Sequence, residues 1–189
     1  MLKLLRLVAA AALLVSGAVA RADEPRYDLG GLHHEDWFLM SLLVLGEDHA
    51  DAAAAGKRLA IVWEQKGCIY CRDMHDKHLK DPRIAGFVRQ HFAMLQLDLR
   101  GDRMVTDFDG QVLSEKELAR KHRVNLTPTI QFLPESALDL KGKRVADVEV
   151  ARMPGLLNPG HFLAMFEFVQ GRHYEKPMDF DGYLAIRPK

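Results

Sequence analysis

The run EQKGCIYC, residues 64–71, contains both cysteines of this chain. Cys68 and Cys71 are three positions apart, so their sulfur atoms come within bridging reach at the first turn of a helix. A disulfide across so short a loop hardly restricts the unfolded chain and therefore contributes little to stability. We expect this pair to perform chemistry rather than to hold the fold together.

The residues on either side of the pair predict a strand that leads into a helix. Residues 58–64 alternate between two apolar faces, which predicts a buried strand, and residues 67–80 begin as a turn and continue as a helix. A helix N-terminus carries partial positive charge and free N–H groups, so it stabilises a thiolate at Cys68, and Lys66 adds positive charge nearby. Cys68 is then the predicted nucleophile toward a disulfide in another protein. Cys71 is the predicted resolving residue, which attacks the mixed disulfide and releases that partner.

A C-x-x-C pair has other uses, which the neighbouring residues limit. Attachment of haem requires His directly after the second cysteine, and this chain has Arg72. A zinc site needs two further ligands, and His75 and His78 could supply them only in a cramped arrangement on one helix. We interpret these histidines as solvated or partly packed helix residues, and a metal-binding module remains an alternative.

The rest of the chain predicts an α/β domain. Helices are expected at 36–45, 48–55, 84–91, 114–122 and 158–171, and strands at 92–99, 129–133 and 144–153. Residues 101–110 read as a polar loop that ends in a surface turn. Alternation of strands and helices favours parallel pairing, and the last two strands favour one antiparallel hairpin at an edge. Two helix starts are marked by capping signals, Ser114 with Glu117 and Asn158 with Pro159.

Thr127-Pro128-Thr129 follows the cysteines by about sixty residues and leads into a strand. With the strand–C-x-x-C–helix unit, it resembles the thioredoxin superfamily over roughly residues 57–171. The resemblance implies a thioredoxin-like fold: a central mixed sheet flanked by helices, here with an N-terminal helical extension. It further implies a cis peptide bond at Pro128 and a groove in which the backbone of Thr127 binds an extended client segment beside Cys68. Ile69 and Tyr70 would line the same groove.

More narrowly, the chain is similar to the periplasmic SoxW-like thioredoxins of sulfur-oxidation operons. The similarity rests on the run at 64–71, Met74-His75, the DFDG loop at 107–110, Thr127-Pro128-Thr129 and Pro154-Gly155. It implies a reductant fed by a membrane electron donor of the DsbD or CcdA type. It also implies exported clients with thiols or disulfides, sulfur-oxidation proteins among them.

The chain departs from thioredoxin in ways that bear on its chemistry. Gly67 replaces the tryptophan before the first cysteine, and the intervening pair Ile69-Tyr70 also differs, so thioredoxin's reduction potential does not carry over. The buried aspartate of thioredoxin falls at Val62. Glu64, on the same strand face, could replace it as proton acceptor for Cys71, and the alternative is an exposed carboxylate at the strand end.

The first twenty residues predict a signal peptide. Lys3 and Arg6 precede an apolar run, and Ala18-Val19-Ala20 is a cleavage pattern, with a second candidate cut after Ala22. The uncharged run is short against the ~20 residues needed to cross a bilayer, and an uncleaved anchor is the alternative. The predicted organisation is a signal peptide at 1–20, a lead and helical extension at 21–56, the thioredoxin-like domain at 57–171 and a tail at 172–189. The predicted location is the periplasm.

Composition supports one ordinary globular domain. The 189 residues are 48% hydrophobic, and 26 Lys and Arg balance 26 Asp and Glu, whereas a nucleic-acid binder usually has a basic excess. No cofactor and no metal are predicted. The predicted function is a periplasmic thiol–disulfide oxidoreductase that reduces exported clients, and a disulfide oxidase or isomerase of the same fold is the alternative.

Overall fold

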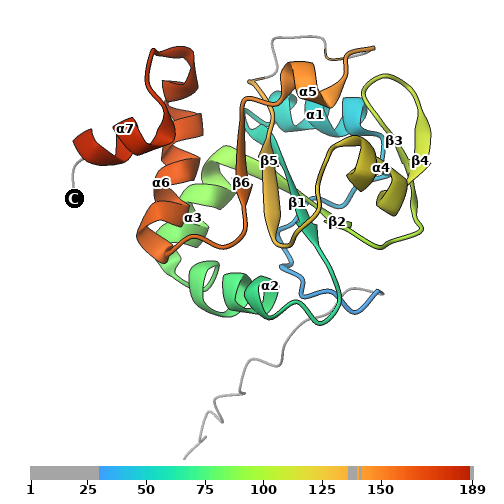
Figure 1. Cartoon of the computed structure of the whole chain (residues 1–189), viewed down its shortest axis with the longest axis horizontal. Helices are drawn as coiled ribbons and strands as arrows, with labels where there is room; N and C mark the ends of the chain where they lie inside the picture. Colours follow the sequence, from blue (N-terminus) through green and yellow to red (C-terminus); the bar gives the residue numbers. More distant parts are fainter. Residues whose placement is uncertain (1–29, 136–139, 141, 188–189) are drawn as a thin grey trace, which may run out of the picture.

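The computed structural model describes residues 30–135, 140 and 142–187, so the predicted signal peptide at 1–20 and the lead up to residue 29 lie outside the described residues. Figure 1 shows a central sheet with helices on both sides. In chain order the elements are α1 (Leu45–Ala54), β1 (Arg58–Glu64), α2 (Ile69–Asp73), the π-helical turn η1 (Met74–His78), α3 (Pro82–His91), β2 (Phe92–Asp98), β3 (Met104–Thr106), β4 (Val112–Ser114), α4 (Glu115–Lys121), β5 (Thr129–Phe132), α5 (Val145–Val148), β6 (Ala151–Pro154), α6 (Pro159–Gln170), the 3₁₀ turn η2 (His173–Glu175) and α7 (Phe180–Ile186).

The main sheet has the strand order β2-β1-β5-β6. β1 pairs parallel with β2 and antiparallel with β5, and β5 pairs antiparallel with the edge strand β6. This mixed sheet flanked by helices confirms the predicted fold class. The edge pair is antiparallel as expected, although α5 lies in the connection between its strands.

The alternation along β1 separates two apolar cores. Leu59, Ile61 and Trp63 face the core built with α1, α4 and α5, whereas Ala60 and Val62 face the core built with α3 and α6. In the second core the rings of Phe92, Phe132, Phe162 and Phe166 pack edge-on or tilted, with centroids 5.0–5.9 Å apart. Full burial of such a side chain contributes about 1.5–3 kcal/mol, so these rings hold α6 firmly against the sheet.

The helix predicted at 36–45 is wrong. This segment runs irregularly beside the sheet, with the N–H of Leu39 bonded to the carbonyl of Met94, and the helix begins only at Leu45. Leu43 has a positive φ of 61°, which a helix does not accept. Met40 and Leu42 are 98% and 89% exposed, so the apolar residues of this segment do not share one buried helical face.

Three further predictions need correction. The strand predicted at 144–153 begins with the short helix α5, because Val145 and Val148, three positions apart, both turn into the core. The loop predicted at 101–110 contains the strand β3. The helix predicted at 67–80 is interrupted by the π-helical turn, in which the N–H of Leu79 bonds the carbonyl of Met74. None of the described helices is both long and apolar enough to cross a membrane.

The expected surface turn at 107–110 is partly buried. Asp107 is 2% exposed; its Oδ1 lies 3.2 Å from Nε2 of His122, and its Oδ2 forms an ion pair with Nζ of Lys121 at 2.6 Å. Burial raises its pKa, but these two partners outweigh that effect and lower the pKa to about 2. The loop is therefore anchored to α4 by a buried charge network rather than left on the surface.

Candidate redox site

Cys68 and Cys71 form a disulfide at the start of α2, with their Cα atoms 5.2 Å apart. Cys68 is the N-cap of the helix, and the N–H of Cys71 donates to its Sγ at 3.0 Å. Gly67 makes the tight turn before it with a φ of +75°, which a residue without a Cβ adopts without strain. Cys71 is only 1% exposed, whereas Cys68 is partly exposed, so Cys68 is the sulfur that another protein can reach.

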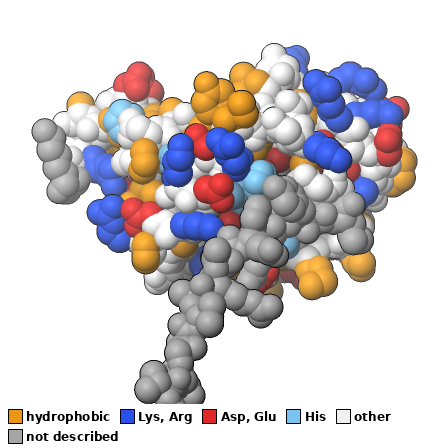
Figure 2. Space-filling model, turned by 90° about the horizontal axis from the view of Figure 1, so that it is seen from below, with side chains coloured by type: hydrophobic (Ala, Val, Ile, Leu, Met, Phe, Trp, Pro, Cys, Tyr) orange, Lys and Arg blue, Asp and Glu red, His pale blue; other side chains and the backbone are white. Residues whose placement is uncertain are grey.

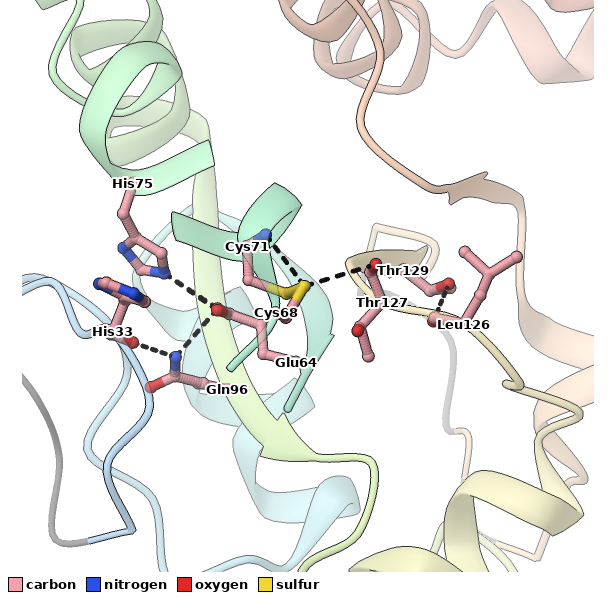
Figure 3. The surroundings of a disulfide bond; sticks show 9 residues. All are labelled: His33, Glu64, Cys68, Cys71, His75, Gln96, Leu126, Thr127 and Thr129. Carbon is pink, nitrogen blue, oxygen red and sulfur yellow. Dashed lines mark hydrogen bonds and ion pairs between the residues drawn. A yellow bond between two sulfur atoms is a disulfide. The ribbon is translucent and has the colours of Figure 1, made fainter. Parts of the chain in front are cut away.

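Thr127 and Pro128 lie directly against the pair. Sγ of Cys68 is 3.5 Å from the carbonyl oxygen of Thr127, and the Thr127–Pro128 peptide bond is cis (Figure 3). Two bonds fix this corner at the start of β5: Thr129 Oγ1 donates to the carbonyl of Leu126 at 2.8 Å, and the N–H of Gly155 donates to the carbonyl of Pro128 at 2.7 Å. The loop before β5 thus holds a backbone carbonyl beside the accessible sulfur.

The rim of the pair is apolar and open to solvent. Ile69 and Tyr70, the residues between the cysteines, are 63% and 65% exposed, and Leu126 across the pair is 42% exposed. Figure 2 views the molecule from below, the side on which α2 lies in Figure 1, and shows apolar groups among interspersed acidic and basic side chains. Apolar side chains around a reactive sulfur suit contact with another protein.

Glu64 ends β1 beneath the pair and is fully buried. Its carboxylate accepts a bond from Nε2 of Gln96 at 2.9 Å and lies 3.0 Å from Nε2 of His75. The alternative of an exposed carboxylate at the strand end is therefore wrong. Figure 3 draws the Glu64 carboxylate between His75 and the disulfide.

His75 bridges two carboxylates. Its Nε2 faces Glu64, and its Nδ1 lies 2.9 Å from Oε1 of Glu35. Burial lowers the pKa of His75, but the hydrogen bonds to Glu35 and Glu64 outweigh burial and raise it to about 9. The ring is therefore a cation at neutral pH.

The prediction of solvated or partly packed histidines was wrong for both His75 and His78. They are 3% and 4% exposed, and His78 Nε2 bonds the carbonyl of Leu157 at 2.8 Å. Spacing could not identify the partners of His75, because Glu35 lies forty positions away. The signal available was only that His75 follows Cys71 by about one helical turn, on the same side as a strand-end glutamate.

The segment before the helix α1 completes this network. The carbonyl of His33 accepts a 2.5 Å bond from Nε2 of Gln96, and His34 Nδ1 lies 3.2 Å from Oε1 of the same side chain. The His33 ring stacks on His75 with centroids 5.7 Å apart, and burial lowers the pKa of His33. Residues expected in a lead sequence are thus packed against Gln96 and His75, the two side chains that bond Glu64.

Lys66 lies further from the disulfide than the residues described above. Its side chain is exposed and its methylene end lies beside Gly31. Of the residues predicted to act together, Cys68, Cys71, Thr127 and Pro128 meet at the disulfide, and Glu64 lies beneath it. Lys66 lies at the edge of this site.

Comparison with known proteins agrees with this geometry. Residues 45–170 match the sequence model of a family described as a thioredoxin-like domain. A thioredoxin from Thermus thermophilus, solved in solution, is 27% identical with a TM-score of 0.50, covering 69% of this chain and 88% of that one. A thioredoxin-fold protein from Helicobacter pylori is 25% identical, with a TM-score of 0.46 and coverage of 69% and 79%.

The C-terminal domain of DsbD from Neisseria meningitidis, in the oxidised form, is also similar in fold. It is 14% identical, with a TM-score of 0.46 over 66% of this chain and 90% of that one. No curated protein matches the chain. The family match spans most of the chain and includes the C-x-x-C motif, so the chain belongs to the family of thioredoxin-like domains and is a thiol–disulfide oxidoreductase of that fold.

Proposed function

We propose that the protein is a periplasmic reductase of disulfides in exported client proteins, and that it is of the SoxW-like type. The observation that carries this proposal is the position of Cys68. Cys68 is partly exposed at the start of α2, and its Sγ accepts the N–H of Cys71 and lies 3.5 Å from the carbonyl oxygen of Thr127. A sulfur so placed can attack another disulfide while a client strand lies along the Thr127 backbone.

The reaction follows from the two cysteines in their reduced state. The Cys68 thiolate attacks one sulfur of the client disulfide, and the other client sulfur leaves as a thiolate. Cys71 loses its proton to Glu64 and then attacks Sγ of Cys68, which breaks the mixed disulfide and releases the second client thiolate. The client gains two electrons, and the protein is left with the Cys68–Cys71 disulfide, the state that the structure contains.

Residues around the pair have proposed roles in this cycle. Ile69, Tyr70 and Thr127-Pro128 form the client groove, and Lys66 adds positive charge at its edge. The oxidised pair must be reduced again, and we propose a membrane electron donor of the DsbD or CcdA type. Clients would be exported proteins with thiols or disulfides, including those of sulfur oxidation.

The direction of electron flow is tested by the reduction potential of the pair. The protein is equilibrated in dithiothreitol buffers, and the free thiols are labelled and counted. A potential of roughly −220 mV or lower, toward thioredoxin at about −270 mV, supports a reductase. A potential near about −120 mV is typical of a strong oxidant and would mean that the protein forms disulfides instead.

A further inference from the structure

We propose that Glu35 and His75 are positioning residues that keep Glu64 ionised beneath the dithiol, so that Glu64 can accept the proton of Cys71. This inference rests on the proposed thiol–disulfide exchange and assigns two residues that act through Glu64. One of them, Glu35, lies outside the residues that match the thioredoxin-like family.

The first argument is the burial of Glu64. An ionised carboxylate away from water is costly unless a charge or hydrogen bonds compensate it, and an uncompensated one takes up a proton. A protonated Glu64 could not accept a second proton from Cys71. Gln96, which bonds the Glu64 carboxylate, is neutral, whereas His75, with Nε2 at 3.0 Å, can carry a positive charge.

The second argument is the placement of these groups on one side of the sheet. Glu64 has the same orientation on β1 as Val62, which packs in one core with Met74, the residue before His75. Cys71 is buried about one helical turn before His75. The strand-end carboxylate, the imidazole and the resolving cysteine therefore share the space between β1 and α2, as Figure 3 shows.

The third argument is the role of Glu35. A neutral imidazole has one N–H, whereas a ring with a carboxylate at each nitrogen is satisfied fully only as the cation with two. Glu35 at Nδ1 and Glu64 at Nε2 give His75 that environment, in agreement with its pKa of about 9.

Other ionisable groups lie near this cluster, and the charges of Asp76 and Arg72 act on His33. The His33 ring stacks on His75, and burial, followed by the charge of His75, lowers the pKa of His33. Arg72 and Lys77 both bond Asp73, and Asp76 lies within ion-pair distance of Lys80. Glu35 is thus the carboxylate that secures the charge on His75 from outside the family-matched domain.

The test measures only the second step of the exchange, in which Cys71 attacks the mixed disulfide on Cys68. Reduced protein reacts with dithiobis(nitrobenzoate): Cys68 forms a mixed disulfide and releases one coloured thiolate, and attack by Cys71 then releases the second. The rate of the second release is followed between about pH 6 and pH 8 in the wild type and in Glu35→Gln, His75→Gln and Glu47→Gln. Glu47 is an exposed glutamate at the start of α1 and serves as the matched control.

Loss of one carboxylate lowers the pKa of His75 by about 1–3 units, into or near the measured range. Glu35→Gln should therefore match the wild type at about pH 6 and become slower by roughly tenfold at about pH 8. His75→Gln should be slow throughout, and Glu47→Gln should match the wild type. A nuclear magnetic resonance titration of the His75 ring should show the lowered pKa in Glu35→Gln directly.

Two results would overturn the inference: equal second-step rates for Glu35→Gln and Glu47→Gln at every pH, or an unchanged titration of His75. Glu35 is partly exposed, so Glu35→Gln carries the test even if His75→Gln does not fold. If Glu35→Gln shows the expected shift relative to the wild type but the wild type reduces no protein disulfide, this inference is supported and the proposed function is contradicted. If the wild type reduces insulin but Glu35→Gln shows no shift, the proposed function is supported and this inference is contradicted.

Discussion

Sγ of Cys68 lies 3.5 Å from the carbonyl oxygen of Thr127, although the two residues are 59 positions apart in the chain. The loop before β5 and the start of α2 thus place the backbone of Thr127 next to the sulfur of Cys68. In the proposed reaction, the client segment that carries the disulfide would lie along the backbone of Thr127 while Cys68 attacks.

Replacement of either cysteine should separate the two steps of the reaction. Cys68→Ser should abolish insulin reduction, because the accessible nucleophile is lost. Cys71→Ser should leave the attack intact but trap clients as mixed disulfides on Cys68, visible as shifted bands on non-reducing gels that disappear with dithiothreitol. Full activity of Cys68→Ser, or a Cys71→Ser variant that traps nothing, would contradict these roles.

The groove should bind clients through its apolar rim. Tyr70→Ser removes a ring that is 65% exposed, so we expect KM for a protein client to rise several-fold while the melting temperature hardly changes, as for most surface substitutions. Met40→Ser provides the control, because Met40 is 98% exposed and belongs to no part of the groove. If both variants have the same KM as the wild type, Tyr70 does not contact clients.

Stability should fall as pH rises past neutrality, owing to His75. Its pKa is about 9 in the folded protein against about 6.5 in an unfolded chain, so its contribution is fully present below pH 6.5 and is lost as pH rises toward 9. The shift corresponds to about 3 kcal/mol at most. Urea unfolding at several pH values measures this decline, which should be much flatter in His75→Gln.

Asp107 should make the protein less stable as the pH falls, whereas His75 makes it less stable as the pH rises. The pKa of Asp107 is lowered to about 2, so it stabilises the fold above about pH 4 and loses this contribution as pH falls through 2. Asp107→Asn should therefore be less stable than the wild type at pH 7 and differ from it much less near pH 2. Asp181→Asn, on the exposed side of α7, is the control and should show no such pH dependence.

The buried side-chain amide of Gln131 should stabilise the contact between β1 and β5. Gln131 Oε1 accepts a 2.5 Å bond from the indole N–H of Trp63, and its Nε2 donates to Glu149 at 2.8 Å. Gln131→Leu would leave both groups without this partner, at a cost of about 2–4 kcal/mol in the free energy of unfolding. Gln111→Leu, at an exposed position, should change this free energy by less than about 0.5 kcal/mol.

The sequence predicted well those elements whose signals are local. β1 runs from Arg58 to Glu64 as its alternation indicated, and the capping signals correctly marked the starts of α4 and α6. These features depend on neighbours within a few positions, where periodicity and capping operate.

Elements shaped by distant contacts were mispredicted. Residues 36–44 are apolar enough for a helix, but their backbone instead bonds β2 and β3 at Met94 and Thr106. Burial of Glu64 and His75 depends in the same way on Glu35 and Gln96, which come from other parts of the chain. The spacing of these four residues in the sequence does not predict that they contact one another in the folded protein.

The contact between Glu35 and His75 also limits how this redox unit can be exchanged between proteins. A chimera that transplants only residues 45–170, the part that matches the family, would carry the dithiol, the groove and Glu64 but would leave Glu35 behind. Its His75 would then have one carboxylate partner instead of two. The redox unit with its charged surroundings therefore begins upstream of the residues that match the family, and a chimera should include Glu35 to keep both carboxylates beside His75.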